Sequence, residues 1–149
     1  MSAPTIHASA VLVGGRAVLI RGPAGSGKSR LALALLQAGT SGGLSFTRLV
    51  GDDRVHVEAA HERLLVRPAE ALAGLIEVRG LGIRKVPFES AAVVGLVVDL
   101  SAPDSERLPA RKSAVAEVAG VVLPRLAVAP GEDPFRLLIF ALHTTDSSL

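Results

Sequence analysis

Two short apolar runs near the start of the chain predict a β-hairpin that leads directly into a loop and a helix. The runs cover residues 6–13 and 16–21, and the Gly14-Gly15 dipeptide between them accepts the positive φ of a tight turn. After a glycine-rich stretch, residues 28–38 carry apolar side chains at helical spacing. The apolar face of this helix consists of Leu31, Ala34, Leu35 and Ala38. Its expected C-cap is Gly39.

The remainder of the chain alternates short strands with polar connections. Further strands are expected at residues 48–50, 55–60, 64–67, 75–78, 92–99 and 121–128. The last of them should be an edge or bent strand, because Pro124 interrupts it. A helical turn is expected at residues 68–72, and Asp133 followed by Pro134 predicts a helix over 135–143. The irregular segments are expected at residues 40–47, 101–112 and 143–149, the last as a frayed end.

Composition narrows the fold class. The 149 residues are 49% hydrophobic but include four Phe and no Trp, Tyr or Cys, so the core must consist of aliphatic layers. Such layers favour parallel or mixed strands covered by helices. We therefore predict one α/β domain over residues 1–149, with a mixed, mostly parallel sheet and added β-hairpins.

Charge and apolar pattern argue against several classes of partner. The 16 basic residues are nearly balanced by 14 acidic ones and do not cluster with aromatic residues, so no nucleic-acid partner is expected. The apolar runs are too short to cross a bilayer, so no membrane partner is expected either. Without Cys there is neither a disulfide framework nor a thiolate metal site, and the expected location is the cytoplasm.

The most specific motif is a complete phosphate-binding loop between a predicted strand and a predicted helix. It consists of Gly22, Pro23, Ala24, Gly25, Ser26, Gly27, Lys28 and Ser29. Glycines in such a loop let backbone N–H groups converge on phosphate oxygens, and the following helix adds its positive dipole end. We therefore expect this P-loop to bind ATP or a related polyphosphate, with Lys28 at the β- and γ-phosphates and the Ser29 hydroxyl on Mg²⁺.

Transfer of a phosphoryl group also needs carboxylates, and two positions compete for that role. Asp99 ends an apolar strand, which is the usual place of the second Mg²⁺ carboxylate in P-loop NTPases. Asp52 and Asp53 follow the short strand at 48–50, where adjacent like charges are costly unless a cation or a shared proton relieves them. The bland alternative for this pair is a polar turn.

Four segments occur in the order seen in the catalytic domain of bacterial HPr kinase/phosphorylase. They are the IHAS segment with His7, the P-loop, the Asp52-Asp53 pair and the EVRGLGI block, and the chain resembles that family from about residue 5 to residue 100. The resemblance implies an HPr kinase/PEP carboxykinase-like fold. It also implies ATP- and Mg²⁺-dependent phosphorylation of a serine on the phosphocarrier protein HPr, in regulation of the phosphotransferase system, and a reverse reaction of phosphate with phosphoserine that yields pyrophosphate.

The resemblance assigns roles to individual residues. Lys28 and Ser29 would bind the nucleotide and Mg²⁺, with Asp53 and Glu77 as further metal ligands. Asp52 would be the base that accepts the proton of the acceptor serine. A carboxylate can do so as the oxygen begins to bond to phosphorus, because positioning outweighs basicity in this chemistry.

Three further assignments also come from the resemblance. His7 is similar to the family's active-site histidine, and Arg107 to its mobile-loop arginine. Contacts with HPr or a neighbouring subunit would come from Glu77, Val78, Arg79, Gly80, Leu81, Gly82 and Ile83. Judged by residue type alone, His7 reads as a surface histidine, Glu77 with Arg79 as an ion pair on one face of an extended segment, and Arg107 as part of a solvated basic loop.

The chain also departs from the family pattern. Ala8 follows His7 where the family commonly has Gly, and residues 129–134 stand where it usually shows a Pro-Gly-Arg-Asn-like stretch. The first strand begins within a few residues of Met1, so the catalytic domain is expected without the family's N-terminal domain. A homo-oligomer is expected, but these departures leave the family's hexamer and its reverse reaction open.

Two other functions fit the same loop. One is a small-molecule kinase or simple NTPase that uses Asp99, and the other is a nucleotide-sensing module without transfer. The kinase hypothesis makes one geometric prediction that all its parts require: Asp52 and Asp53 must lie beside the P-loop.

Overall fold

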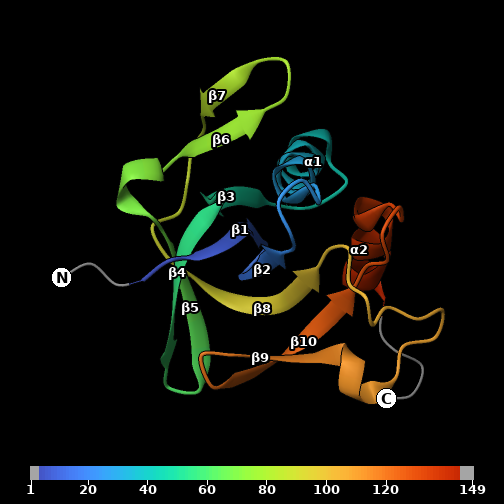
Figure 1. The fold of residues 1–149 in the computed structure, drawn as a ribbon. Coiled ribbons are helices and arrows are strands. Elements are labelled where there is room, and N and C mark those ends of the chain that lie inside the picture. Colours follow the sequence, from blue (N-terminus) through green and yellow to red (C-terminus); the bar gives the residue numbers. More distant parts are fainter. Residues whose placement is uncertain (1–3, 145–149) are drawn as a thin grey trace.

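The computed structural model describes residues 4–144, which form a closed ring of strands covered by two helices and extended by a projecting hairpin (Figure 1). The elements are β1 (Ile6–Val13), β2 (Arg16–Arg21), α1 (Lys28–Ser41), β3 (Thr47–Gly51), β4 (Arg54–Ala60), β5 (Arg63–Pro68), a 3₁₀ turn (Glu70–Leu72), β6 (Leu75–Val78), β7 (Gly82–Lys85), β8 (Ala92–Asp99), a second 3₁₀ turn (Arg111–Ala114), β9 (Val115–Val118), β10 (Val121–Ala127) and α2 (Pro134–His143). Within that range, no helix has the length and hydropathy needed to cross a membrane.

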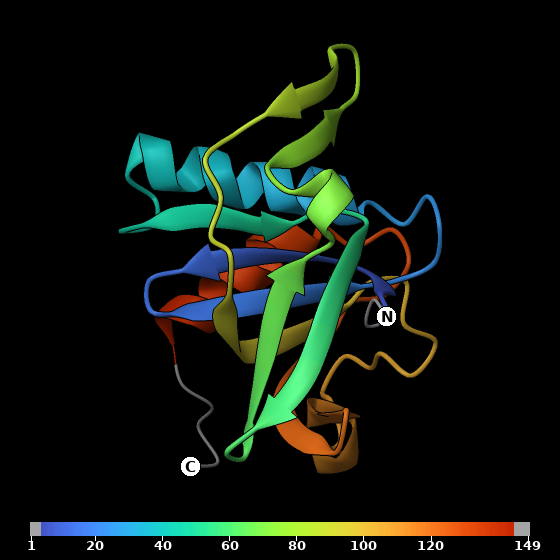
Figure 2. The ribbon, with the colours of Figure 1, turned by 90° about the vertical axis from the view of Figure 1, so that its left-hand side faces the viewer.

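The main sheet closes on itself. Its strands follow the order β2-β1-β4-β5-β8-β10-β9, and β2 also pairs with β8, so β1, β2, β4, β5 and β8 complete a ring. β3 pairs with β1 beside this ring, while β6 and β7 form a separate two-stranded sheet. The hairpin β6–β7 stands out from the body of the molecule next to α1 in both views (Figures 1 and 2). Closure gives every strand of the ring a partner on both sides.

The prediction of a mixed sheet is confirmed, but the prediction that it is mostly parallel is wrong. β8 runs parallel to β2 and to β10, whereas the other pairings that the structure describes are antiparallel. The reason lies in the connections. A parallel pair needs a crossover of a dozen or more residues, but most consecutive strands here are joined by turns of two or three residues. Aliphatic composition alone does not reveal connection length.

Two apolar clusters fill the inside and the outer face of the ring. Alternate residues of β2 serve both: Ala17 and Leu19 belong to the inner cluster, whereas Val18 and Ile20 pack in the outer cluster with α1 and α2. All four are at most 2% exposed. Because successive side chains of a strand point to opposite faces, a strand buried on both faces reads as a continuous apolar run. β2 is therefore held firmly at the point where it enters the P-loop.

Helix α1 begins at Lys28 as predicted but continues beyond its expected C-cap. The cap is Gly42, at φ 91°, and not Gly39. Gly39 lies inside the helix because β3 approaches it closely: a Cβ at Gly39 would stand 2.1 Å from Thr47 Oγ1. This glycine serves packing, and the left-handed residue that ends the helix comes three positions later.

The C-terminal half contains one misread strand and two short strands that the sequence pattern did not predict. Residues Val121–Pro124 of β10 pair with β9, and Arg125–Ala127 pair with β8, so β10 lies between two strands and is not an edge. Pro124 is tolerated because the pairing partner changes there. The unpredicted strands β9 and β7 each contain four residues. Of the expected frayed end, His143 is the last residue of α2, and residues 145–149 lie outside the described range.

The start of α2 allows a direct test of its capping. Asp133 is the N-cap, and its Oδ1 accepts a hydrogen bond from the Phe135 N–H at 3.1 Å. Replacing Asp133 with Ala should lower the free energy of unfolding by about 1 kcal/mol, measured by urea denaturation. Glu132→Ala, which removes a neighbouring carboxylate outside the cap, is the matched control. Equal losses in both variants would show that the cap bond is not the cause.

Candidate functional site

The P-loop forms the connection between β2 and α1, as predicted. Gly25 and Gly27 adopt left-handed backbone angles, at φ 80° and 100°, and the Ser26 N–H donates to Pro23 O at 3.0 Å. Gly22 must lack a side chain, because a Cβ there would stand 2.6 Å from Ser26 Oγ and 3.0 Å from Leu100 Cβ. The first N–H groups of a helix have no partner within the helix, so the start of α1 offers donors at the mouth of the loop.

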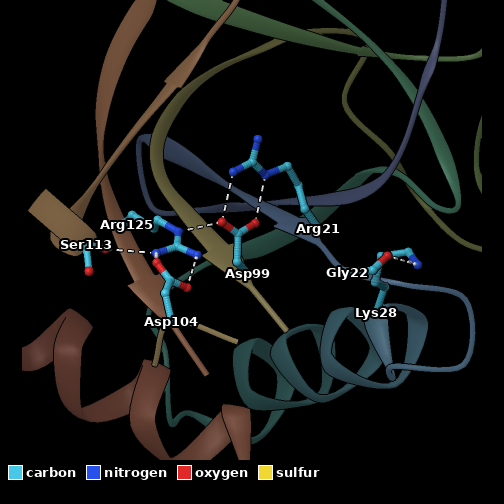
Figure 3. Close-up of polar contacts among 7 residues, drawn as sticks. All are labelled: Arg21, Gly22, Lys28, Asp99, Asp104, Ser113 and Arg125. Atoms are coloured by element: carbon cyan, nitrogen blue, oxygen red, sulfur yellow. Dashed lines mark hydrogen bonds and ion pairs between the residues drawn. The ribbon is translucent and has the colours of Figure 1, made fainter. Parts of the chain in front are cut away.

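Lys28 is the first residue of α1, and its side chain folds back over the loop. Its Nζ donates to Gly22 O at 2.9 Å and to Pro23 O at 3.3 Å (Figure 3). An ammonium has three donors, so this arrangement holds the positive charge over the loop and leaves one donor available. The charge therefore already stands where an anionic group would enter.

Asp52 lies beside the end of the P-loop, as the sequence argument required. Ser29 Oγ is 2.8 and 3.0 Å from its two carboxylate oxygens, and the Glu77 N–H donates to Oδ2 at 3.3 Å. The fourth contact comes from Ser9, whose Oγ donates to Asp52 Oδ1 at 2.7 Å. Asp52 is 6% exposed, and its oxygens are surrounded by donors. These hydrogen bonds connect the acid to α1, β1 and β6.

Asp53 differs from its neighbour because it is exposed. Its backbone is fixed in the left-handed region, at φ 68°, which Asp tolerates better than most residues. Its N–H donates to Ser9 Oγ at 3.3 Å, and its carbonyl accepts from the Ala8 N–H at 3.1 Å. Tight backbone fixation with an exposed side chain is a suitable arrangement for a group that must meet a substrate.

A cavity of about 350 Å³ brings the candidate residues together. It is lined by Ala24, Gly25, Gly27, Lys28, Ser29, Arg30, Leu33, Asp53, Glu77, Val78 and Arg79. A larger cavity of about 750 Å³ lies along α1 beside Phe135 and Ile139 of α2, but its lining is mainly apolar and contains none of the candidate catalytic residues. We place the site at the smaller cavity, because it combines phosphate-binding backbone with both signs of charge.

Two predicted residues do not line this cavity. His7 is exposed on β1, where it pairs with Arg54, and it shares a strand face with Ser9 two residues away. Arg107 is exposed in the loop after β8. Sequence reasoning missed Ser9, a buried hydroxyl that contacts both members of the acid pair. A polar residue inside an otherwise apolar strand was the available signal.

The EVRGLGI block is a hairpin and not the single extended segment that was expected. β6 ends at Val78, and the Leu81 N–H donates to Val78 O at 2.9 Å to close the turn. Gly80 and Gly82 take positive φ angles of 90° and 89°. Glu77 lies in β6 whereas Arg79 lies in the turn, so the expectation that both project from one extended face is wrong.

Asp99, the competing carboxylate, is engaged elsewhere. Arg21 donates from Nε and Nη2 to its two oxygens at 2.7 and 2.8 Å, and Arg125 Nε donates to Oδ2 at 2.5 Å (Figure 3). Burial opposes ionisation of Asp99, but the hydrogen bonds and charges of the two guanidinium groups hold its pKa below the ordinary value. Both oxygens are therefore committed to arginines, which disfavours Asp99 as a metal ligand.

Comparisons with known proteins agree with this site. A family model described as the HPr Serine kinase C-terminal domain matches residues 2–133. The HPr kinase/phosphorylases of Enterococcus faecalis and Streptococcus pneumoniae are 37% and 36% identical to this chain over 135 residues. The matches cover 83% of this chain and 41% of each relative, so the chain spans about two fifths of the length of these curated relatives.

A solved structure, the Hpr(Ser) kinase/phosphatase from Coxiella burnetii, has the same fold. The TM-score is 0.74 at 24% sequence identity, and the match covers 94% of this chain and 88% of that one. The fold likeness, the two relatives and the family model all lead to the same group of proteins. The chain belongs to the HPr serine kinase C-terminal domain family.

Proposed function

We propose that this chain is an ATP- and Mg²⁺-dependent serine kinase domain that phosphorylates the phosphocarrier protein HPr. The observation that carries the proposal is the contact between Ser29 Oγ and the Asp52 carboxylate, at 2.8 and 3.0 Å, which joins the P-loop to the acid pair. The next residue, Asp53, lines the same cavity as Lys28. A phosphoryl donor and an acceptor hydroxyl can therefore meet in one place.

The P-loop would hold the donor's phosphates. The left-handed glycines and the start of α1 direct backbone N–H groups toward the cavity, and Lys28 would exchange its contacts with Gly22 O and Pro23 O for phosphate oxygens. Arg30 also lines the cavity. These groups bind and orient the donor, which is most of what the protein contributes to phosphoryl transfer.

The residues fit Mg²⁺ by the chemistry of their donor atoms. Mg²⁺ is usually held by one or two carboxylates together with substrate phosphates, and Ser29, Asp52 and Glu77 supply hard oxygen atoms around the end of the loop. In residues 4–144 no group of three or more His, Asp or Glu side chains is arranged as a complete metal site. When bound, the ion would neutralise charge that develops on the transferred group.

Geometry favours Asp53 over Asp52 as the proton acceptor. A base must come within about 2.6–3.2 Å of the hydroxyl whose proton it takes. Asp52 is buried and already accepts hydrogen bonds from Ser9, Ser29 and the Glu77 N–H. Asp53 is exposed and lines the cavity. Asp52 then fits the task of holding Ser29, a metal ligand and β6 in register.

The hairpin β6–β7 is the proposed contact surface for HPr. Leu81 and Ile83 are 65% and 61% exposed, and Arg79 and Arg84 beside them are exposed as well. Such mixed apolar and basic exposure beside the cavity suits a protein acceptor better than a small metabolite. Roles for His7 and Arg107, the reverse reaction and assembly into an oligomer stay predictions from the resemblance.

The decisive experiment is to incubate the chain with ATP, Mg²⁺ and HPr and to map phosphate on HPr by mass spectrometry. We expect one phosphoserine that requires both Mg²⁺ and an intact Asp53. ATP hydrolysis that HPr does not stimulate would instead indicate a simple NTPase. Nucleotide binding without any turnover would indicate a sensor.

A further inference from the structure

One guanidinium group makes contacts with three separate segments. Arg125 on β10 donates from Nε to Asp99 Oδ2 at 2.5 Å, and its two terminal nitrogens pair with both oxygens of Asp104 at 2.8 and 3.0 Å. Nη1 also donates to Ser113 O at 3.0 Å. The Arg125 side chain is only 12% exposed. The planar fork of arginine suits this kind of multiple recognition, which a lysine cannot reproduce.

Two of these contacts lie at the ends of one loop. Asp104 and Ser113 flank a segment that contains the exposed residues Arg107 and Leu108, the latter 72% exposed. The hydrogen bonds of Arg125 therefore close the base of the loop while leaving its tip in solvent (Figure 3). Loops whose ends are fixed in this way lose less conformational freedom when a partner binds the tip.

The third contact connects this loop to the P-loop. Asp99 accepts from Arg125 and from Arg21, and Arg21 directly precedes Gly22. β8, which ends at Asp99, pairs with both β2 and β10. Hydrogen bonding to Asp104 and Asp99 raises the pKa of Arg125, so the guanidinium stays charged throughout the pH range in which the protein is folded. One carboxylate thus joins the strands that carry the two loops.

We propose that Arg125 is a positioning residue, which closes the loop from Asp104 to Ser113 and holds it against the strand ends that carry the P-loop, so that Arg107 is directed to the acceptor. The inference rests on the proposed kinase function for its last step. The closed loop itself does not depend on that function and can be tested separately.

Loop closure can be measured by trypsin cleavage after Arg107. Asp104→Asn removes the bidentate pair at a carboxylate that is 48% exposed, so the fold should persist. Cleavage should be about five-fold faster than in the wild type, since about 1 kcal/mol of lost closure changes the open population by that factor. Arg125→Lys should accelerate cleavage further. Glu58→Gln, which breaks the distant and exposed pair with Arg67, should have no effect. Unchanged cleavage in both loop variants would overturn the proposal.

The positioning role can be measured by a double-mutant cycle. Asp104→Asn should lower kcat/KM for HPr about five-fold and leave the nucleotide Kd unchanged, matching its effect on loop opening. Added to Arg107→Ala, it should cause no further loss, because the loop then has no arginine to position. Independent losses that multiply would refute action through Arg107. Failure of the wild type to phosphorylate HPr would refute the proposed function, while the cleavage assay would still decide loop closure.

Discussion

Replacing Lys28 with methionine should lower phosphoryl transfer to HPr by about 10²–10³-fold, the loss typical of removing one preorganised charge-stabilising donor. Lys28 Nζ lies over the loop, 2.9 Å from Gly22 O, and methionine keeps most of the apolar length of the side chain without its charge. ATP turnover and thermal unfolding should be measured together. The unfolding temperature should change little, because Lys28 is partly exposed and lies at the start of α1.

Lys85→Met is the matched control for this experiment. Lys85 is an exposed lysine on β7, so its replacement removes the same charge outside the P-loop. A comparable loss of activity in both variants would show that general electrostatics, and not the P-loop ammonium, supports the reaction. Full activity of Lys28→Met would place transfer at another site.

Asp53→Asn should lower the rate of transfer by about 10²–10⁴-fold, the usual contribution of a general base. The amide is nearly isosteric and the carboxylate is exposed, so nucleotide affinity and stability should stay close to those of the wild type. The informative measurement is single-turnover phosphorylation of HPr, combined with nucleotide binding at equilibrium.

Asp52→Asn separates the two acids. Asparagine offers only one acceptor oxygen where Asp52 now accepts from two hydroxyl groups and one N–H, so one buried donor would face an amide NH₂. This variant should lose stability and Mg²⁺ affinity as well as rate. A stable Asp52→Asn protein that binds Mg²⁺ normally and has lost only the transfer step would return the base role to Asp52.

Local features of the fold could be predicted from sequence because their causes are local. The Gly14-Gly15 turn, the glycine-rich P-loop and the Asp133-Pro134 helix start each specify their own backbone angles within a few residues. The first hairpin and both helix starts accordingly appear where they were expected. The order of the P-loop and the acid pair also predicted their convergence, since both follow strands of one sheet.

The missed features depend on contacts between distant residues. Closure of the ring requires β2 to pair with β8, and nothing in either apolar run specifies that register. Gly39 resembled a helix end because Thr47, which fills the space beside it, belongs to another element. Asp99 resembled a metal ligand because its guanidinium partners lie 78 and 26 residues away. Patterns in short windows cannot weigh such partners.

The closed ring divides the site into a fixed part and an adjustable part. β2 and β8 are bonded along both edges, so moving the base of the P-loop would break two ladders at once. The hairpin β6–β7 and the segment after β8 carry no such double constraint, and weakly held segments open at the lowest free-energy cost. Accommodation of substrates of different size should therefore come from these two appendages, while the nucleotide end of the site behaves as a rigid anvil.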